Sequence, residues 1–90
     1  MATPDQNMQW REWRSSLWSA VAALPEPQRF AIVLRYAEGM DYAEIAKVLD
    51  CPVGTVRSRL HYGLTALQEK LGDAVNPPTL QLANNDMFQE

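Results

Sequence analysis

Apolar residues recur at helical spacing along two neighbouring segments in the second half of the chain. Within residues 41–49, one face of a helix carries Tyr42, Ile45, Ala46 and Leu49. Residues 53–71 make a second, longer apolar face from Val53, Val56, Leu60, Leu64, Leu67 and Leu71. Two amphipathic helices joined by so tight a turn predict a helix-turn-helix, whose second helix would lie in the major groove of DNA.

Two further helices are expected in the first half of the chain. The first is predicted over residues 8–23, with an inward face of Trp10, Trp13, Leu17, Val21 and Leu24. The second is predicted over residues 26–37, after a break at Pro25 and Pro27, with an inward face of Phe30, Val33, Leu34 and Ala37. No segment shows the alternation typical of strands. The expected fold is therefore all-α, with four helices and a C-terminal helix-turn-helix.

Capping and turn residues give the expected boundaries. Asp41 and Glu44 are close to a capping box for the third helix, and Pro52 suits the first position of the fourth. Gly72 is the expected end of the fourth helix, inside which Gly63 favours bending or fraying. The folded domain is predicted over residues 8–72, after a disordered lead (1–7) and before a flexible tail (73–90).

Composition indicates in which compartment such a domain would work and how it could bind DNA. An apolar fraction of 47% in 90 residues suffices for one packed core. The single cysteine excludes an intramolecular disulfide, and no apolar run approaches the roughly 18 residues of a membrane span. We therefore expect a soluble, cytoplasmic protein without a membrane partner. Because the net charge is −3, DNA binding would depend on a local basic patch.

The fourth helix carries the candidate DNA-binding residues. If Val56 and Leu60 are buried, Ser58 and Tyr62 project almost opposite to them. Flanking positions on the same helix are Thr55, Arg57, Arg59 and His61. Lys47, on the outer side of the third helix, is a candidate phosphate contact. Short polar groups allow close approach to base edges, and guanidinium groups suit guanine or phosphate. The alternative for these charges is an ordinary solvated helix face.

Other polar residues do not form a catalytic or metal site. N-capping accounts for Asp41 and Glu44, while Cys51 has no second cysteine as a metal partner. His61, the only histidine, lacks a triad partner. The chain is therefore expected not to be an enzyme and to use no cofactor or metal.

Three large apolar residues fall outside the expected inward faces of the first two helices. These residues are Trp18, Ile32 and Tyr36. One hypothesis is that they form an exposed patch for a protein partner, since such patches commonly mark interaction sites. The alternative is that they pack the first helix onto the second.

Three segments together resemble a known family. They are Leu24-Pro-Glu-Pro-Gln-Arg-Phe-Ala-Ile-Val-Leu-Arg-Tyr36, Glu38-Gly-Met-Asp-Tyr-Ala-Glu-Ile-Ala46 and Cys51-Pro-Val-Gly-Thr-Val-Arg-Ser-Arg-Leu-His61. Over residues 15–72 the chain resembles region 4 of extracytoplasmic-function (ECF) sigma factors of bacterial RNA polymerase, a helix-turn-helix of the winged-helix-like or sigma region 4 type. The block around Arg57-Ser58-Arg59 separates it from other helix-turn-helix families.

The resemblance implies a function in transcription initiation. The fourth helix would bind the minus-35 promoter element as double-stranded DNA, so that RNA polymerase is directed to the promoter. Arg57 and Ser58 fall where the family contacts bases and phosphates, and His61 and Tyr62 lie on the same side. The resemblance also implies contact with the flap of the polymerase β subunit or with an anti-sigma factor. We expect one domain of a longer sigma factor rather than a stand-alone protein.

A second reading remains open at this point. The chain could be a protein-interaction module of the same fold, binding the polymerase flap or an anti-sigma factor and having only weak DNA affinity. The net negative charge favours it, as does the absence of Lys or Arg from Tyr62 until Lys70. The intact Arg57-Ser58-Arg59 face favours DNA binding.

Overall fold

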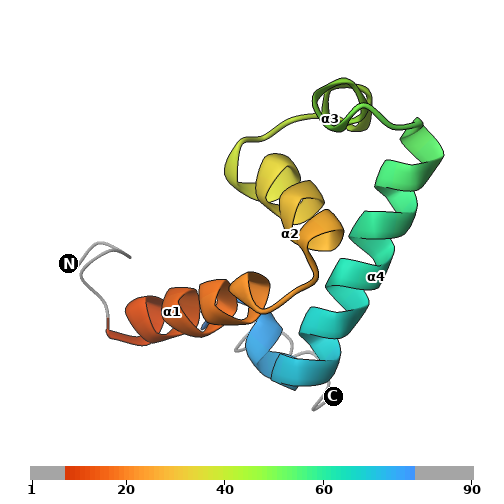
Figure 1. The fold of residues 1–90 in the computed structure, drawn as a ribbon. Helices are drawn as coiled ribbons and strands as arrows, with labels where there is room; N and C mark the ends of the chain where they lie inside the picture. Colours follow the sequence, from red (N-terminus) through yellow and green to blue (C-terminus); the bar gives the residue numbers. More distant parts are fainter. Residues whose placement is uncertain (1–7, 79–90) are drawn as a thin grey trace, which may run out of the picture.

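The computed structural model describes residues 8–78, and they are almost entirely helical (Figure 1). In chain order the elements are α1 (Met8–Ala22), α2 (Glu26–Ile32), the π-helical turn η2 (Val33–Ala37), α3 (Tyr42–Leu49), α4 (Val53–Leu71) and the 3₁₀ turn η3 (Gly72–Val75). The predicted all-α, four-helix fold with a C-terminal helix-turn-helix is confirmed. Residues 8–78 contain no strand, so the wing of a winged-helix domain has no counterpart there.

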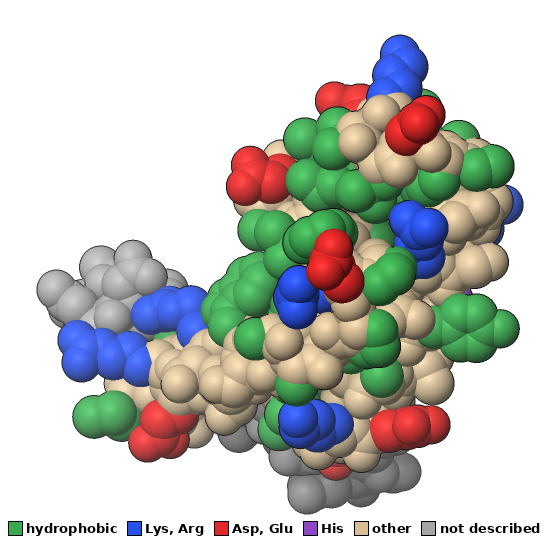
Figure 2. Space-filling view, viewed as in Figure 1, with side chains coloured by type: hydrophobic (Ala, Val, Ile, Leu, Met, Phe, Trp, Pro, Cys, Tyr) green, Lys and Arg blue, Asp and Glu red, His purple; other side chains and the backbone are tan. Residues whose placement is uncertain are grey.

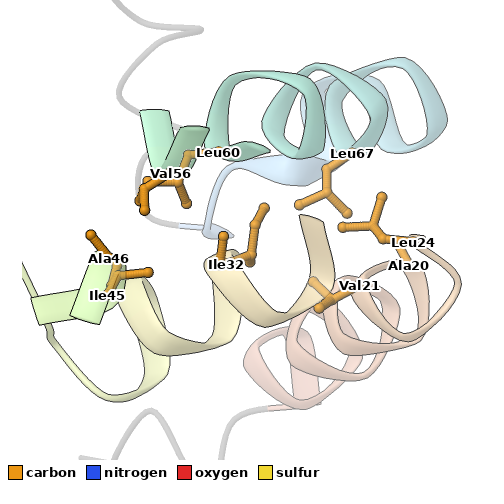
Figure 3. Close-up of a cluster of buried hydrophobic side chains, with 10 residues drawn as sticks. Ala20, Val21, Leu24, Ile32, Ile45, Ala46, Val56, Leu60 and Leu67 are labelled. Atoms are coloured by element: carbon orange, nitrogen blue, oxygen red, sulfur yellow. The ribbon is translucent and has the colours of Figure 1, made fainter. Parts of the chain in front are cut away.

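Helix α4 is the element against which the others pack. It contacts α1, α2 and α3, and in Figure 1 α3 lies near its N-terminal end while α1 meets it towards its C-terminal end. Ten buried apolar side chains, from the four helices and the α1–α2 connection, form one core: Ala20, Val21, Leu24, Ala31, Ile32, Ile45, Ala46, Val56, Leu60 and Leu67. In Figure 3, Val56 and Leu60 face Ile45 and Ala46 at one end of this core. Their burial confirms the face predicted for the third helix and the centre of the one predicted for the fourth, whereas Val53 and Leu64, also expected inside, are 40% and 39% exposed.

The predicted inward face of the second helix is wrong in part. Ile32, expected at the surface, is only 3% exposed, whereas Phe30, expected inside, is 43% exposed. Residues 30–34 are all apolar, so helical spacing alone could not select one face. Packing selects Ile32, because α4 presents Gly63 to it and leaves room for its side chain.

The chain passes from α2 to α3 through the π-helical turn η2 and one glycine. The Glu38 N–H donates to the Val33 carbonyl at 3.1 Å, and the Met40 N–H donates to the Leu34 carbonyl at 3.1 Å. Gly39 then takes a φ of 70°, in the left-handed region that glycine adopts without steric penalty. The chain is thereby turned into α3, and the predicted end of the second helical segment before Gly39 is confirmed.

A capping box starts α3, and a tight turn ends it. The Glu44 N–H donates to the Asp41 carboxylate at 2.8 Å, and the Asp41 N–H donates to the Glu44 carboxylate at 3.1 Å. At the other end Asp50 adopts a left-handed φ of 53°, which Asp tolerates better than most residues. Pro52 then lies just outside α4, one position before the predicted one.

The helical body extends beyond the predicted boundary at residue 72. The indole Nε1–H of Trp13 donates to the Val75 carbonyl at 3.3 Å, and Pro78 is buried. The expectation of a flexible tail from residue 73 is therefore wrong for residues 73–78, because η3 returns the chain to α1. The rest of that tail (79–90) and the expected disordered lead (1–7) lie outside the described residues. Within residues 8–78, no helix combines the length and apolarity needed to cross a membrane.

Candidate nucleic-acid interface

Helix α4 presents one exposed polar face opposite its buried one. Its buried residues are Val56, Leu60, Gly63 and Leu67. Ser58 lies on the opposite side and is exposed, as are Arg57, His61 and Tyr62 around it. Gly63 does not interrupt the helix, which runs from Val53 to Leu71, so the expected fraying beyond this glycine is not seen. The result is a continuous face long enough to enter a major groove.

Arg57 lies at one edge of this face, beside α3. Its Cζ is 5.9 Å from the centre of the Tyr42 ring, within the range of a cation–π contact. Within residues 8–78 it forms no ion pair with a carboxylate. The guanidinium is thus accessible, and no carboxylate of the described residues neutralises it, which suits a DNA contact.

Arg59 lies at the other edge and is less accessible. Its Nη1 group donates to Cys51 Sγ at 3.8 Å, and the side chain is half-buried against the helix-turn-helix turn. Thr55, one turn earlier on α4, is also half-buried. Of the two arginines predicted together, Arg57 is the more accessible, and Arg59 keeps only part of its surface open to a partner.

His61 and Tyr62 extend the exposed face along α4. Their ring centres are 5.5 Å apart, with the planes at 66°. Tyr62 is 62% exposed, which is unusual for a large aromatic residue that serves only packing. The structure therefore brings Arg57, Ser58, His61 and Tyr62 onto one surface of α4.

Lys47 approaches the same region from α3. It is exposed and borders a shallow hollow where the end of α3 meets the start of α4, together with Asp50 and Pro52. A cation here would meet the DNA backbone beside the groove rather than a base. The Asp50 carboxylate in the same hollow reduces the positive potential at this edge.

The predicted partner patch of Trp18, Ile32 and Tyr36 is not formed. Trp18 on α1 and Tyr36 in η2 are exposed as expected, but Ile32 points into the core. Ile32 fills the space that Gly63 leaves on α4 and is therefore unavailable to a partner. A protein-partner role for Trp18 or Tyr36 stays a prediction.

Sequence reasoning missed a different apolar surface, which we call the α2–α3 groove. It is lined by Arg29, Phe30, Val33, Leu34, Val48 and Leu49. Phe30 and Val48 are 43% and 57% exposed, and Figure 2 shows hydrophobic side chains gathered over α2 and α3. The five-residue apolar run 30–34 could have predicted this groove, since a short helix with apolar residues on every side cannot bury all of them.

Comparison with known proteins assigns the chain to a family. Residues 14–67 match the family model for sigma-70, region 4. The ECF RNA polymerase sigma-E factors of Escherichia coli (strain K12) and Salmonella typhimurium (strain LT2) are each 41% identical to the chain over 71 residues, which is 79% of the chain and 37% of each relative. That of Haemophilus influenzae is 39% identical over 69 residues, 77% of the chain and 36% of the relative. The chain belongs to the sigma-70 region 4 family, and it spans about a third of the length of these relatives.

Proposed function

We propose that the chain is the promoter-binding domain of an ECF sigma factor, which binds the minus-35 element and so directs RNA polymerase to initiation. The observation that carries the proposal is the exposed face of α4, where Arg57 lacks an ion-pair partner within residues 8–78 and adjoins Ser58 opposite the buried Val56 and Leu60. Membership of the sigma-70 region 4 family supports the same role.

Each residue of the face has a role that its position suits. Arg57 is placed to donate to guanine O6 and N7 or to a phosphate, while the short Ser58 side chain permits close approach to base edges. His61 and Tyr62 contact the groove further along α4. Lys47, Thr55 and Arg59 at the flanks contact phosphates. The domain acts by binding in the cytoplasm, without a chemical step of its own.

Selection from random duplexes tests this proposal. The chain would be incubated with a random double-stranded library, and the retained DNA sequenced over several rounds. Enrichment of one short motif by the natural chain, lost with Arg57→Ala, is the expected result. Retention of random sequence by both proteins would contradict sequence-specific promoter binding.

A second candidate function uses the α2–α3 groove. We infer that this groove accepts an apolar helix of a protein partner, with the polymerase β flap as the proposed occupant. The exposed Phe30 and Val48 support this, since a partner that covers them removes apolar surface from water. Arg29, whose Cζ is 5.4 Å from the Phe30 ring centre, adds a cation at the groove for an acidic residue of the partner.

Binding of a β-flap fragment to the chain tests this second function. Val48→Glu should weaken flap binding at least tenfold, because it buries a carboxylate in an apolar contact. Val53→Glu is the matched control, since Val53 is also exposed but lies outside the groove. Equal flap affinity of both variants would contradict the assignment of the flap to this groove. If Val48→Glu lost binding to an anti-sigma domain but kept binding to the flap, the anti-sigma domain would be the occupant instead.

A further inference from the structure

Two arginines from different elements approach one tyrosine ring. The Cζ of Arg35 in η2 lies 5.3 Å from the centre of the Tyr42 ring, and the Cζ of Arg57 in α4 lies 5.9 Å from it. Both distances are within the range of about 6 Å over which a guanidinium is attracted to an aromatic face. Tyr42, the first residue of α3, therefore connects η2 to the candidate DNA-binding helix.

The two arginines differ in how firmly they are held. Arg35 is half-buried, and its Nη1 donates to the Met40 carbonyl at 2.9 Å, which ties it to the turn before α3. Arg57 is exposed, and among hydrogen bonds, ion pairs and ring contacts within residues 8–78 its guanidinium has the Tyr42 ring alone. Tyr42 itself is half-buried and packs against the core. The anchored Arg35 thus restricts the Tyr42 ring, and the ring in turn restricts the guanidinium of Arg57.

An unrestrained arginine side chain loses rotamer entropy when it binds. A ring that restricts the guanidinium before DNA arrives removes part of that loss. Within residues 8–78 no carboxylate pairs with Arg57, so its guanidinium remains available to a base or phosphate.

We propose that Tyr42 is a positioning residue, which orients Arg57 for DNA without itself contacting a base. The proposal rests on the DNA-binding function proposed above and adds a residue to its machinery. Arg35 supports it indirectly by fixing the ring. The essential property of Tyr42 is the aromatic ring rather than the hydroxyl, so Tyr42→Phe should preserve the role and Tyr42→Leu should abolish it.

The side chain of Arg57 in the free chain gives the first readout. Its ¹⁵Nε relaxation would be measured by NMR in the natural chain and in three variants. Tyr42→Leu should increase the mobility of the Arg57 Nε–H vector, while Tyr42→Phe should leave it unchanged. Tyr36→Leu is the matched control, since no guanidinium of residues 8–78 lies over the exposed Tyr36 ring. Unchanged Arg57 mobility in Tyr42→Leu would overturn the proposal even if the chain does not bind DNA.

A double-mutant cycle gives the second readout on a selected duplex. Tyr42→Leu should weaken binding about two- to fivefold, the size of an exposed cation–π contact. The same change in an Arg57→Ala background should have no effect, because no guanidinium remains to be positioned. Equal losses in both backgrounds, or a loss with Tyr42→Phe, would show a direct contact and overturn the positioning role. Absence of duplex binding by the natural chain would instead contradict the proposed function.

Discussion

A β-carbon built on Gly63 of α4 would lie 2.9 Å from Cδ1 of Ile32 in α2. It would also lie 3.2 Å from Ile32 Cγ1 and 3.3 Å from the β-carbon of Gln28. Because Ile32 is buried, its side chain has little space into which to move. The close packing of α2 against α4 therefore depends on a glycine inside a helix. This packing sets the position of α4 relative to the rest of the fold.

Gly63→Ala should destabilise the fold despite improving helix propensity. The propensity gain is about 1 kcal/mol, whereas an overpacked core costs roughly 1–3 kcal/mol. We expect a net loss of about 1 kcal/mol in the free energy of unfolding, measured by urea denaturation.

The matched background for this change is Ile32→Val, which removes the Cδ1 atom that the new methyl group would meet. Ile32→Val alone should cost about 0.5–1.5 kcal/mol. In that background Gly63→Ala should cost clearly less, because only the contacts at 3.2 and 3.3 Å remain. An equal loss in both backgrounds would mean that the contact with Ile32 is not what requires the glycine.

The helix-turn-helix could be predicted from the sequence because its apolar positions follow a clear helical period. Residues 41–49 and 53–71 each bury one face, so the exposed position of Ser58 followed from the burial of Val56 and Leu60. The second helix gave no such guidance, since its apolar run allows several faces. Which face is buried depends on Gly63, some 30 residues later, where the sequence suggested only a weak point in a helix.

The candidate site was likewise predictable in part. Exposure of Arg57, His61 and Tyr62 follows from helical phase alone. The half-buried state of Arg59 does not, because it depends on the hydrogen bond to Cys51 across the turn. The contact between Arg57 and Tyr42 depends on the angle at which α3 meets α4, which periodicity does not determine.

Leu60→Ala should reduce stability strongly, because Leu60 is 3% exposed at the centre of the core. Truncation of a buried leucine costs about 2–5 kcal/mol. Leu64→Ala, on the same helix but 39% exposed, is the matched control and should cost well under half of that. Similar losses for the two variants in a denaturant titration would mean that the buried face of α4 is wrongly placed.

Asp41→Ala should destabilise the fold by about 0.5–2 kcal/mol, because it removes the acceptor for the Glu44 N–H at the start of α3. Asp41→Asn retains an N-cap acceptor and should lose much less. Thermal unfolding followed by circular dichroism compares the two. If both variants melt together well below the natural chain, the carboxylate charge and not the cap is what matters.

The salt dependence of DNA binding should be shallow. The candidate interface offers three cations, namely Lys47, Arg57 and Arg59. With about 0.9 counterions released per neutralised phosphate, the slope of log K against log salt should be near −3 at most. Lys47→Ala should reduce its magnitude by about 1. A slope of −6 or steeper would place phosphate contacts outside this face.

The most direct test of DNA recognition by α4 is a fluorescence-anisotropy titration of a selected duplex with the natural chain and with Arg57→Ala. The variant should bind the selected sequence about 1–3 kcal/mol more weakly, the size of a lost contact to a base edge. Its binding to random duplex should change much less, and its melting temperature should match that of the natural chain because Arg57 is exposed. Equal affinity of the two proteins for the selected duplex would contradict the account.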